Sequence, residues 1–283
     1  MRKLNATLFA VSLLFTATLY GAQKNVSGAL YQLSTLNALI EGVYDGDTKC
    51  GELKTKGDFG IGTFNALDGE MIVVNGKVYK VRSDGKTVSV PDSELTPFAA
   101  ITYFETNNTL EPESGMSLKQ LQEFIDFSLP TKNIIYAVRI TGTFKHVKTR
   151  SVPKQNKPYP NLVEVAKTQP VFEFKDIKGA LIGFRFPQYM DGVNLPGYHL
   201  HFLSDDKSCG GHLLEVTLDK TKIETDDIHS YTLVLPDSEE FYRADISKKD
   251  GKAEIVEKQA VQPRPKPKPK PKPQPKKTEE EYH

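Results

Sequence analysis

The sequence has almost no net charge, and this excludes one class of partner. Its 37 lysines and arginines are balanced by 36 aspartates and glutamates, which leaves a formal net charge of +1. Because binding to nucleic acid depends largely on neutralising phosphates, we expect no nucleic-acid partner for the body of the protein. The chain has 283 residues, 38% of them hydrophobic, and is therefore long enough to bury a large core.

Cysteine is equally scarce, with Cys50 and Cys209 as the whole complement. In an oxidising compartment these two residues could form one disulfide. Cys209 also precedes His212 by three residues, so a thiolate ligand to a metal is a second hypothesis. The local sequence favours a third, in which Cys209 lies on a hairpin loop and points away from any metal.

Long apolar runs are also few, and the N-terminal one is short for a membrane span. It extends from Ala6 to Tyr20, follows Arg2 and Lys3, and ends at Gly21-Ala22 before polar residues. This order is typical of a cleavable signal peptide, here residues 1–22. It predicts export to the periplasm or the medium, and the absence of cysteine near the end of the run argues against lipid attachment.

Histidine is rare too, but three of the six histidines lie close together. If residues 197–203 form a strand, the two-residue period places His199 and His201 on one face. Residues 204–211 read as a hairpin loop, and His212 begins the returning strand. Histidines on strands are often only solvated or hydrogen-bonded within the fold. Three imidazoles from two adjacent strands are, however, the ligand set of an open catalytic zinc site.

The remaining periodicities predict a few helices among many strands. Apolar residues at helical spacing predict a helix between Leu30 and Val43. Ser117 and Gln120 have the form of a capping box and predict a second helix that ends at Pro130.

Two charged residues stand beside predicted strands. Asn75-Gly76 predicts a tight hairpin, and Glu70 stands at its start after a glycine-bearing turn. His212 follows Gly211 in the same way, which suggests an internal duplication that relates the two halves. A strand predicted at 134–147 leads into a loop that carries Arg150. This arginine is either a solvated surface charge or a planar, permanently charged group that binds an anion.

The C-terminal segment 259–283 alternates proline and lysine from Gln262 onward. Such a sequence cannot form a core and predicts a disordered, extended polyproline II tail. Its simplest role is a semi-rigid tail, and the functional alternative is electrostatic contact with an anionic cell envelope. The catalytic domain is therefore expected to cover residues 23–258, as two coupled halves.

Three blocks of the sequence together resemble the α-acetolactate decarboxylase family. They are Gly57–Glu70, the Arg150-Ser151-Val152-Pro153 stretch leading to Pro160, and Gly197–His201 with His212. The resemblance runs from about Leu30 to about Lys258. It implies an α+β fold of two similar sheet-containing halves, with mixed or antiparallel strands, a few helices and a metal site between them.

The resemblance also implies the identity of the site residues. It makes His199, His201 and His212 the ligands of a zinc ion and Arg150 the active-site arginine. Glu70 and Glu257 become the catalytic glutamates, and Glu257 fits the family pattern better than Glu254. The implied reaction converts α-acetolactate, a small 2-hydroxy-3-oxo acid, to acetoin and CO2. A homodimer is a separate hypothesis, since the sequence leaves the oligomeric state open.

Two alternatives come from other classes of protein. A metal enzyme of the cupin type also uses two histidines one residue apart on a strand, but it expects a glutamate shortly afterwards. This chain has Ser204, Asp205 and Asp206 there. The second alternative is an exported metal-binding protein without catalysis, for which the proline- and lysine-rich tail is the main support.

Overall fold

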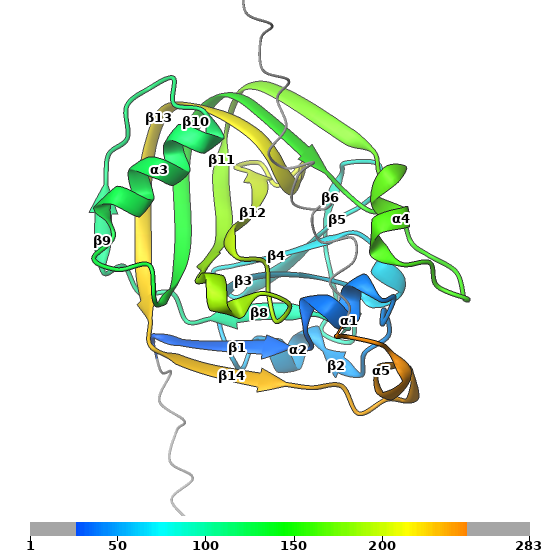
Figure 1. Cartoon of the computed structure of the whole chain (residues 1–283). Coiled ribbons are helices and arrows are strands. Elements are labelled where there is room, and N and C mark those ends of the chain that lie inside the picture. Colours follow the sequence, from blue (N-terminus) through cyan, green and yellow to red (C-terminus); the bar gives the residue numbers. More distant parts are fainter. Residues whose placement is uncertain (1–26, 248–283) are drawn as a thin grey trace, which may run out of the picture.

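The computed structural model describes residues 27–247, and within this range the chain has the expected α+β architecture. A seven-stranded and a five-stranded sheet dominate it, with short helices at their margins (Figure 1). The first sheet takes six strands from residues 29–102 and one from residues 230–234, and the second lies within residues 108–228. The predicted signal peptide, the tail and Glu257 lie outside the described residues.

The seven-stranded sheet is antiparallel except at one edge, where β1 and β14 are parallel. Its central strands β3 and β4 are almost wholly buried, and the turn between them leads directly into Glu70. In spatial order the strands are β14 (Ser230–Val234), β1 (Ala29–Leu33), β8 (Ala99–Thr102), β3 (Phe59–Thr63), β4 (Glu70–Val74), β5 (Lys77–Val81) and β6 (Thr87–Ser89).

The five-stranded sheet contains three unusually long strands that arch over the first sheet (Figure 1). The strands are β10 (Ile135–Arg150), β11 (Val171–Phe186), β12 (Gly197–Ser204), β13 (Gly210–Ile228) and the edge strand β9 (Asn108–Leu110). Since β10 pairs with both β11 and β13, and β12 pairs with both β11 and β13, the pairings of these four strands form a closed cycle.

The two sheets share one hydrophobic core. Phe59 and Ile61 of the first sheet belong to the same buried cluster as Ile182, Phe184 and Leu203 of the second. Each large apolar side chain buried in this way contributes roughly 1.5–3 kcal/mol. The sheets are therefore held face to face, and side chains that approach their common boundary from both sides can form one site.

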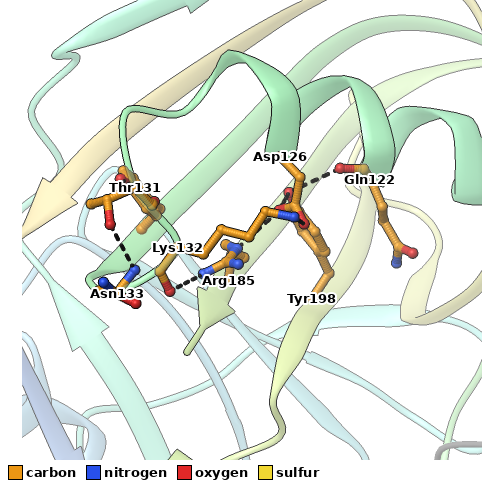
Figure 2. A network of polar contacts seen from close by, with 8 residues as sticks. Gln122, Asp126, Thr131, Lys132, Asn133, Arg185 and Tyr198 are labelled. Carbon is orange, nitrogen blue, oxygen red and sulfur yellow. Dashed lines mark hydrogen bonds and ion pairs between the residues drawn. The ribbon is translucent and has the colours of Figure 1, made fainter. Parts of the chain in front are cut away.

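Helix α3 (Leu118–Ser128) covers the long strands, and its capping box is present as predicted. Its buried Leu121 and Ile125 pack among the apolar residues of the five-stranded sheet. A polar network joins the end of the helix to the sheet (Figure 2): Arg185 of β11 donates to Asp126 at 3.0 Å, and Tyr198 of β12 donates to the same oxygen at 2.9 Å. The network ties the helix to β11 and β12.

The remaining elements are short. They are α1 (Leu36–Ile40), α2 (Cys50–Leu53), α4 (Leu162–Lys167), α5 (Glu239–Arg243), the 3-10 turns η1 (Asn65–Leu67) and η2 (Gln188–Met190), and the small strands β2 (Thr48–Lys49) and β7 (Leu95–Thr96). No helix among residues 27–247 is both long and apolar enough to cross a membrane.

The helix predicted between Leu30 and Val43 is only partly correct. Residues 29–33 form strand β1, which is hydrogen-bonded on both sides, to β8 and to β14. The helix begins only at Leu36, where Thr35 is the N-cap. Tertiary pairing with a strand about two hundred residues away therefore overrides the helical spacing of the apolar residues.

The predicted hairpin at Asn75-Gly76 is confirmed, as both residues have positive φ, 51° and 69°. The disulfide hypothesis is wrong for this structure, because Cys50 and Cys209 are both free thiols. Cys209 directly precedes β13 and lies outside the group of potential metal ligands, as the loop hypothesis expected.

Candidate metal centre and active site

The histidine hairpin forms as the sequence predicted. His199 and His201 lie on one face of β12, and His201 is directly opposite His212 of β13. The centroids of the three rings are 5.0 to 5.2 Å apart. The three imidazoles therefore meet at one point, from two neighbouring strands.

The spacing of the ring nitrogens fits a metal ion. One potential ligand atom from each histidine lies within 4.8 Å of the others, and His212 Nδ1 is 3.3 Å from His201 Nε2. In a tetrahedral zinc site, ligand nitrogens at 2.0–2.1 Å from the ion are about 3.3–3.4 Å from each other. The His201–His212 pair thus has the spacing of two ligands of a tetrahedral metal ion, and the group as a whole could hold one.

Burial keeps these imidazoles neutral, which is the form that binds metals. It lowers the pKa of His201 to about 4, and the pKa values of His199 and His212 fall well below 6.5. The charge of Arg150 lowers all three further. The ring nitrogens are therefore available as electron-pair donors at neutral pH.

A backbone contact from the opposite sheet orients His201. Its Nδ1 lies 2.9 Å from the carbonyl oxygen of Met71 on β4 and must carry the proton to donate there. This leaves Nε2 unprotonated and facing the other histidines. Such a contact fixes both the tautomer and the orientation of a metal-binding ring. It also places the centre between the two sheets, as the resemblance implied.

Glu70 approaches the same point from the seven-stranded sheet. It is the first residue of β4, is buried, and its carboxylate lies 3.6 Å from His201 Nε2. Burial raises the pKa of Glu70 to about 7, and the charge of Arg150 opposes this rise. The carboxyl group can therefore exist in either protonation state near neutral pH.

Arg150 lies at the site, but the prediction that it occupies a loop is wrong. It is the last residue of β10, because the strand extends to 150 through its pairing with β11 and with His212 of β13. The residue is only 7% exposed, and its Nε and Nη1 have no hydrogen-bond partner among the described residues. Burial lowers its pKa, whereas Glu70 raises it. Two donors thus remain for an anionic ligand.

Most of these groups line a cavity of about 70 Å³. Glu70, Arg150, His199 and His212 are among its polar lining, while leucines from α1, α4 and the loop before β12 form an apolar wall. No local sequence pattern predicts this wall, whose residues are Leu36, Leu39, Leu67, Phe98, Val152, Leu162, Ala166 and Leu195. Thr63 and Gln169 also line the cavity, and their side chains carry no recognisable local signal.

Comparison with known proteins identifies the family. A sequence model described as alpha-acetolactate decarboxylase matches residues 30–248. This chain belongs to the alpha-acetolactate decarboxylase family. It is 46% identical to the Methanosarcina mazei enzyme of that name over 224 residues, which are 79% of this chain and 78% of that one. Identity to the enzyme of Klebsiella aerogenes is 41% over 232 residues, or 82% and 89% of the two chains.

Solved structures of alpha-acetolactate decarboxylases show the same fold. The crystal structure of the enzyme from Bacillus subtilis strain 168 superposes with a TM-score of 0.79 at 39% identity and covers 82% of this chain and 98% of that one. Membership of the family makes this chain an enzyme of the carboxy-lyase class. Membership of this family therefore excludes both alternatives, the cupin-type enzyme and the metal-binding protein without catalysis.

Proposed function

We propose that this chain is a zinc-dependent alpha-acetolactate decarboxylase that converts α-acetolactate (2-hydroxy-2-methyl-3-oxobutanoate) to acetoin and CO2. The observation that carries the proposal is the convergence of three neutral imidazoles, two of which line a cavity together with Glu70 and Arg150. The names of the relatives support the substrate, and the donor set supports the metal.

The reaction needs a place for negative charge. In α-acetolactate a carboxylate and a hydroxyl share a carbon next to a ketone, so the departing CO2 leaves an electron pair that moves toward the ketone oxygen. A zinc ion held by His199, His201 and His212 would supply Lewis-acid chemistry, with a positive charge that neutral ligands do not reduce. The low pKa values of the three rings are consistent with this role.

Arg150 is proposed to bind and orient the anionic substrate. Its Nε and Nη1 are buried without a partner among residues 27–247, and they can donate to the carboxylate or to the oxygen that becomes negative. If Arg150 bound the substrate carboxylate more strongly than the transition state, it would oppose the departure of CO2. The arginine therefore accelerates the reaction only to the extent that it favours the developing enediolate.

Glutamates are proposed to move the proton. After CO2 leaves, one carbon of the enediolate must be protonated from one face, which yields acetoin of a single hand. Glu70 lines the cavity beside His201 and is one candidate donor. Glu257 is the other, and it lies outside the described residues.

The apolar wall completes the proposed binding site. Leucines from α1 and α4 line the same cavity as the polar groups, which suits the two methyl groups of the substrate. A wall of this kind also keeps water from the reacting atoms, so the charges of the polar groups act more strongly.

The direct test is an activity assay with racemic α-acetolactate. We expect mature protein to produce acetoin faster than a protein-free blank, to lose this activity after treatment with a chelator, and to regain it when zinc is returned. Acetoin formation that survives complete removal of metal would contradict the zinc dependence. A stoichiometric metal with no turnover would contradict the enzymatic proposal.

We also propose that the protein is exported through residues 1–22. Support comes from the order of basic, apolar and small residues, and from the family match, which begins only at residue 30. Expression of the full-length chain in a bacterial host should give a mature protein whose N-terminal sequence begins at Gln23, recovered outside the cytoplasm. Cytoplasmic protein that retains the apolar run would contradict export.

The tail and the oligomeric state are further proposals. Residues 259–283 lie beyond the family match and carry closely spaced lysines, which supports electrostatic contact with an anionic envelope polymer. The homodimer stays a prediction.

A further inference from the structure

The segment from Asp68 to Met71 makes two contacts with the metal centre. Its Glu70 side chain lies 3.6 Å from His201 Nε2, and its Met71 carbonyl accepts a hydrogen bond from His201 Nδ1 at 2.9 Å. A shift of this segment would therefore displace the carboxylate and rotate the imidazole together. Because catalysis is sensitive to displacements of about 1 Å, the segment needs a rigid support.

The turn that leads into this segment is strained. Ala66, Leu67 and Gly69 all have positive φ, at 58°, 55° and 90°. For residues with a Cβ, each left-handed conformation costs roughly 1–2 kcal/mol. The turn keeps this shape only because surrounding contacts hold it, among them the hydrogen bond from Thr63 Oγ1 to the Gly69 carbonyl at 2.8 Å.

Lys80 provides a second support, from the opposite face of the sheet. It lies on β5 directly across from Met71, so its side chain is on the face that Glu70 does not occupy. It is only 7% exposed, and its ammonium lies 4.5 Å from the centre of the Phe64 ring. Its Nζ is 2.8 Å from Asp68, two residues before Glu70, and 2.6 Å from Glu94.

We propose that Lys80 is a positioning residue of the active site. Its ion pair with Asp68 fixes the strained turn and thereby aims both Glu70 and the Met71 carbonyl at the metal centre. Lys80 is not among the residues that line the cavity, and its ion pairs are with Asp68 and Glu94. The inference rests on the proposed role of Glu70. It assigns a role in positioning the active site to Lys80, which lies on the opposite face of the sheet from Glu70.

The two acidic partners of Lys80 allow positioning to be separated from stability. Asp68 and Glu94 are similarly exposed, at 34% and 31% of their side chains, and both bind the same ammonium. Removing either carboxylate should therefore cost a similar amount of stability. Only Asp68 is continuous with Glu70, since Glu94 lies between β6 and β7.

The experiment compares purified, metal-loaded Asp68→Asn, Glu94→Gln and Lys80→Met with the wild type. We expect Asp68→Asn and Lys80→Met to lower kcat by about 10- to 100-fold, the usual range for residues that orient a metal site, with KM changed less than about threefold. Glu94→Gln should keep kcat within about threefold of wild type. Asp68→Asn and Glu94→Gln should have similar melting temperatures.

The outcomes separate this inference from the proposed function. Equal losses of kcat in Asp68→Asn and Glu94→Gln, or full activity in Lys80→Met, would overturn the positioning role. A Glu70→Gln variant as active as the wild type would remove the role on which the inference rests. Failure of the wild type to decarboxylate α-acetolactate would instead overturn the proposed function.

Discussion

Replacement of His201 by alanine is expected to abolish both metal binding and decarboxylation. His201 is the most buried of the three histidines, and its Nε2 is the nitrogen that faces His212 and Glu70. The variant retains two imidazoles, which is too few to hold an ion that almost always has three or four protein ligands. Bound zinc should fall from about one per chain to a trace, and kcat/KM by more than about a thousandfold.

The measurements are metal content after dialysis and the rate of acetoin formation. His146→Ala is the matched control, since this histidine lies on β10 beside Glu173, is 26% exposed and is not part of the three-histidine group. It should retain metal and activity. A His201→Ala variant with stoichiometric zinc would refute the ligand assignment, and a metal-free variant with full activity would refute the role of the metal. To control for unfolding, the melting temperature of His201→Ala is compared with that of the metal-free wild type.

The histidine cluster could be predicted because its geometry is local. Residues two apart on a strand point to the same face of the sheet, and one short loop returns the chain to the neighbouring strand. His199, His201 and His212 therefore meet whatever the rest of the chain does. The hairpin at Asn75-Gly76 and the capping box at Ser117 were predictable for the same reason, because turn and cap chemistry depend on a few adjacent residues.

The parts that could not be predicted depend on partners distant in the sequence. Strand β1 contains apolar residues at helical spacing and forms a strand because it lies between β8 and β14. In the same way, β10 continues to Arg150 through mostly polar residues, which form a strand because they pair with β11 and β13. The apolar wall of the cavity is assembled from elements throughout the chain, so no sequence window contains it.

Comparison of two buried arginines indicates which one serves the reaction. Arg185 is 6% exposed, and its guanidinium donates to Asp126 and to the carbonyl of Lys132, at 3.0 and 2.8 Å (Figure 2). Arg150 is equally buried at 7%, yet its Nε and Nη1 have no partner among the described residues. Buried donors without a hydrogen-bond partner are costly, so a protein retains them where a ligand completes their contacts. Variants of Arg150 and Arg185 can therefore be compared to separate a role in the reaction from a role in stability.

Replacement of Arg150 by alanine is expected to lower kcat/KM by at least about a hundredfold while zinc remains bound, because the lost contacts are those to a negatively charged transition state. A guanidinium cannot act as a metal ligand, and removing its charge should favour a cation at the histidines. Arg185→Ala should behave oppositely, losing roughly 1.5–3 kcal/mol of stability but little activity. Calorimetry, metal analysis and the acetoin assay together test this reversal. If Arg150→Ala is metal-free and unfolded while Arg185→Ala is inactive and stable, the roles assigned to the two arginines are exchanged.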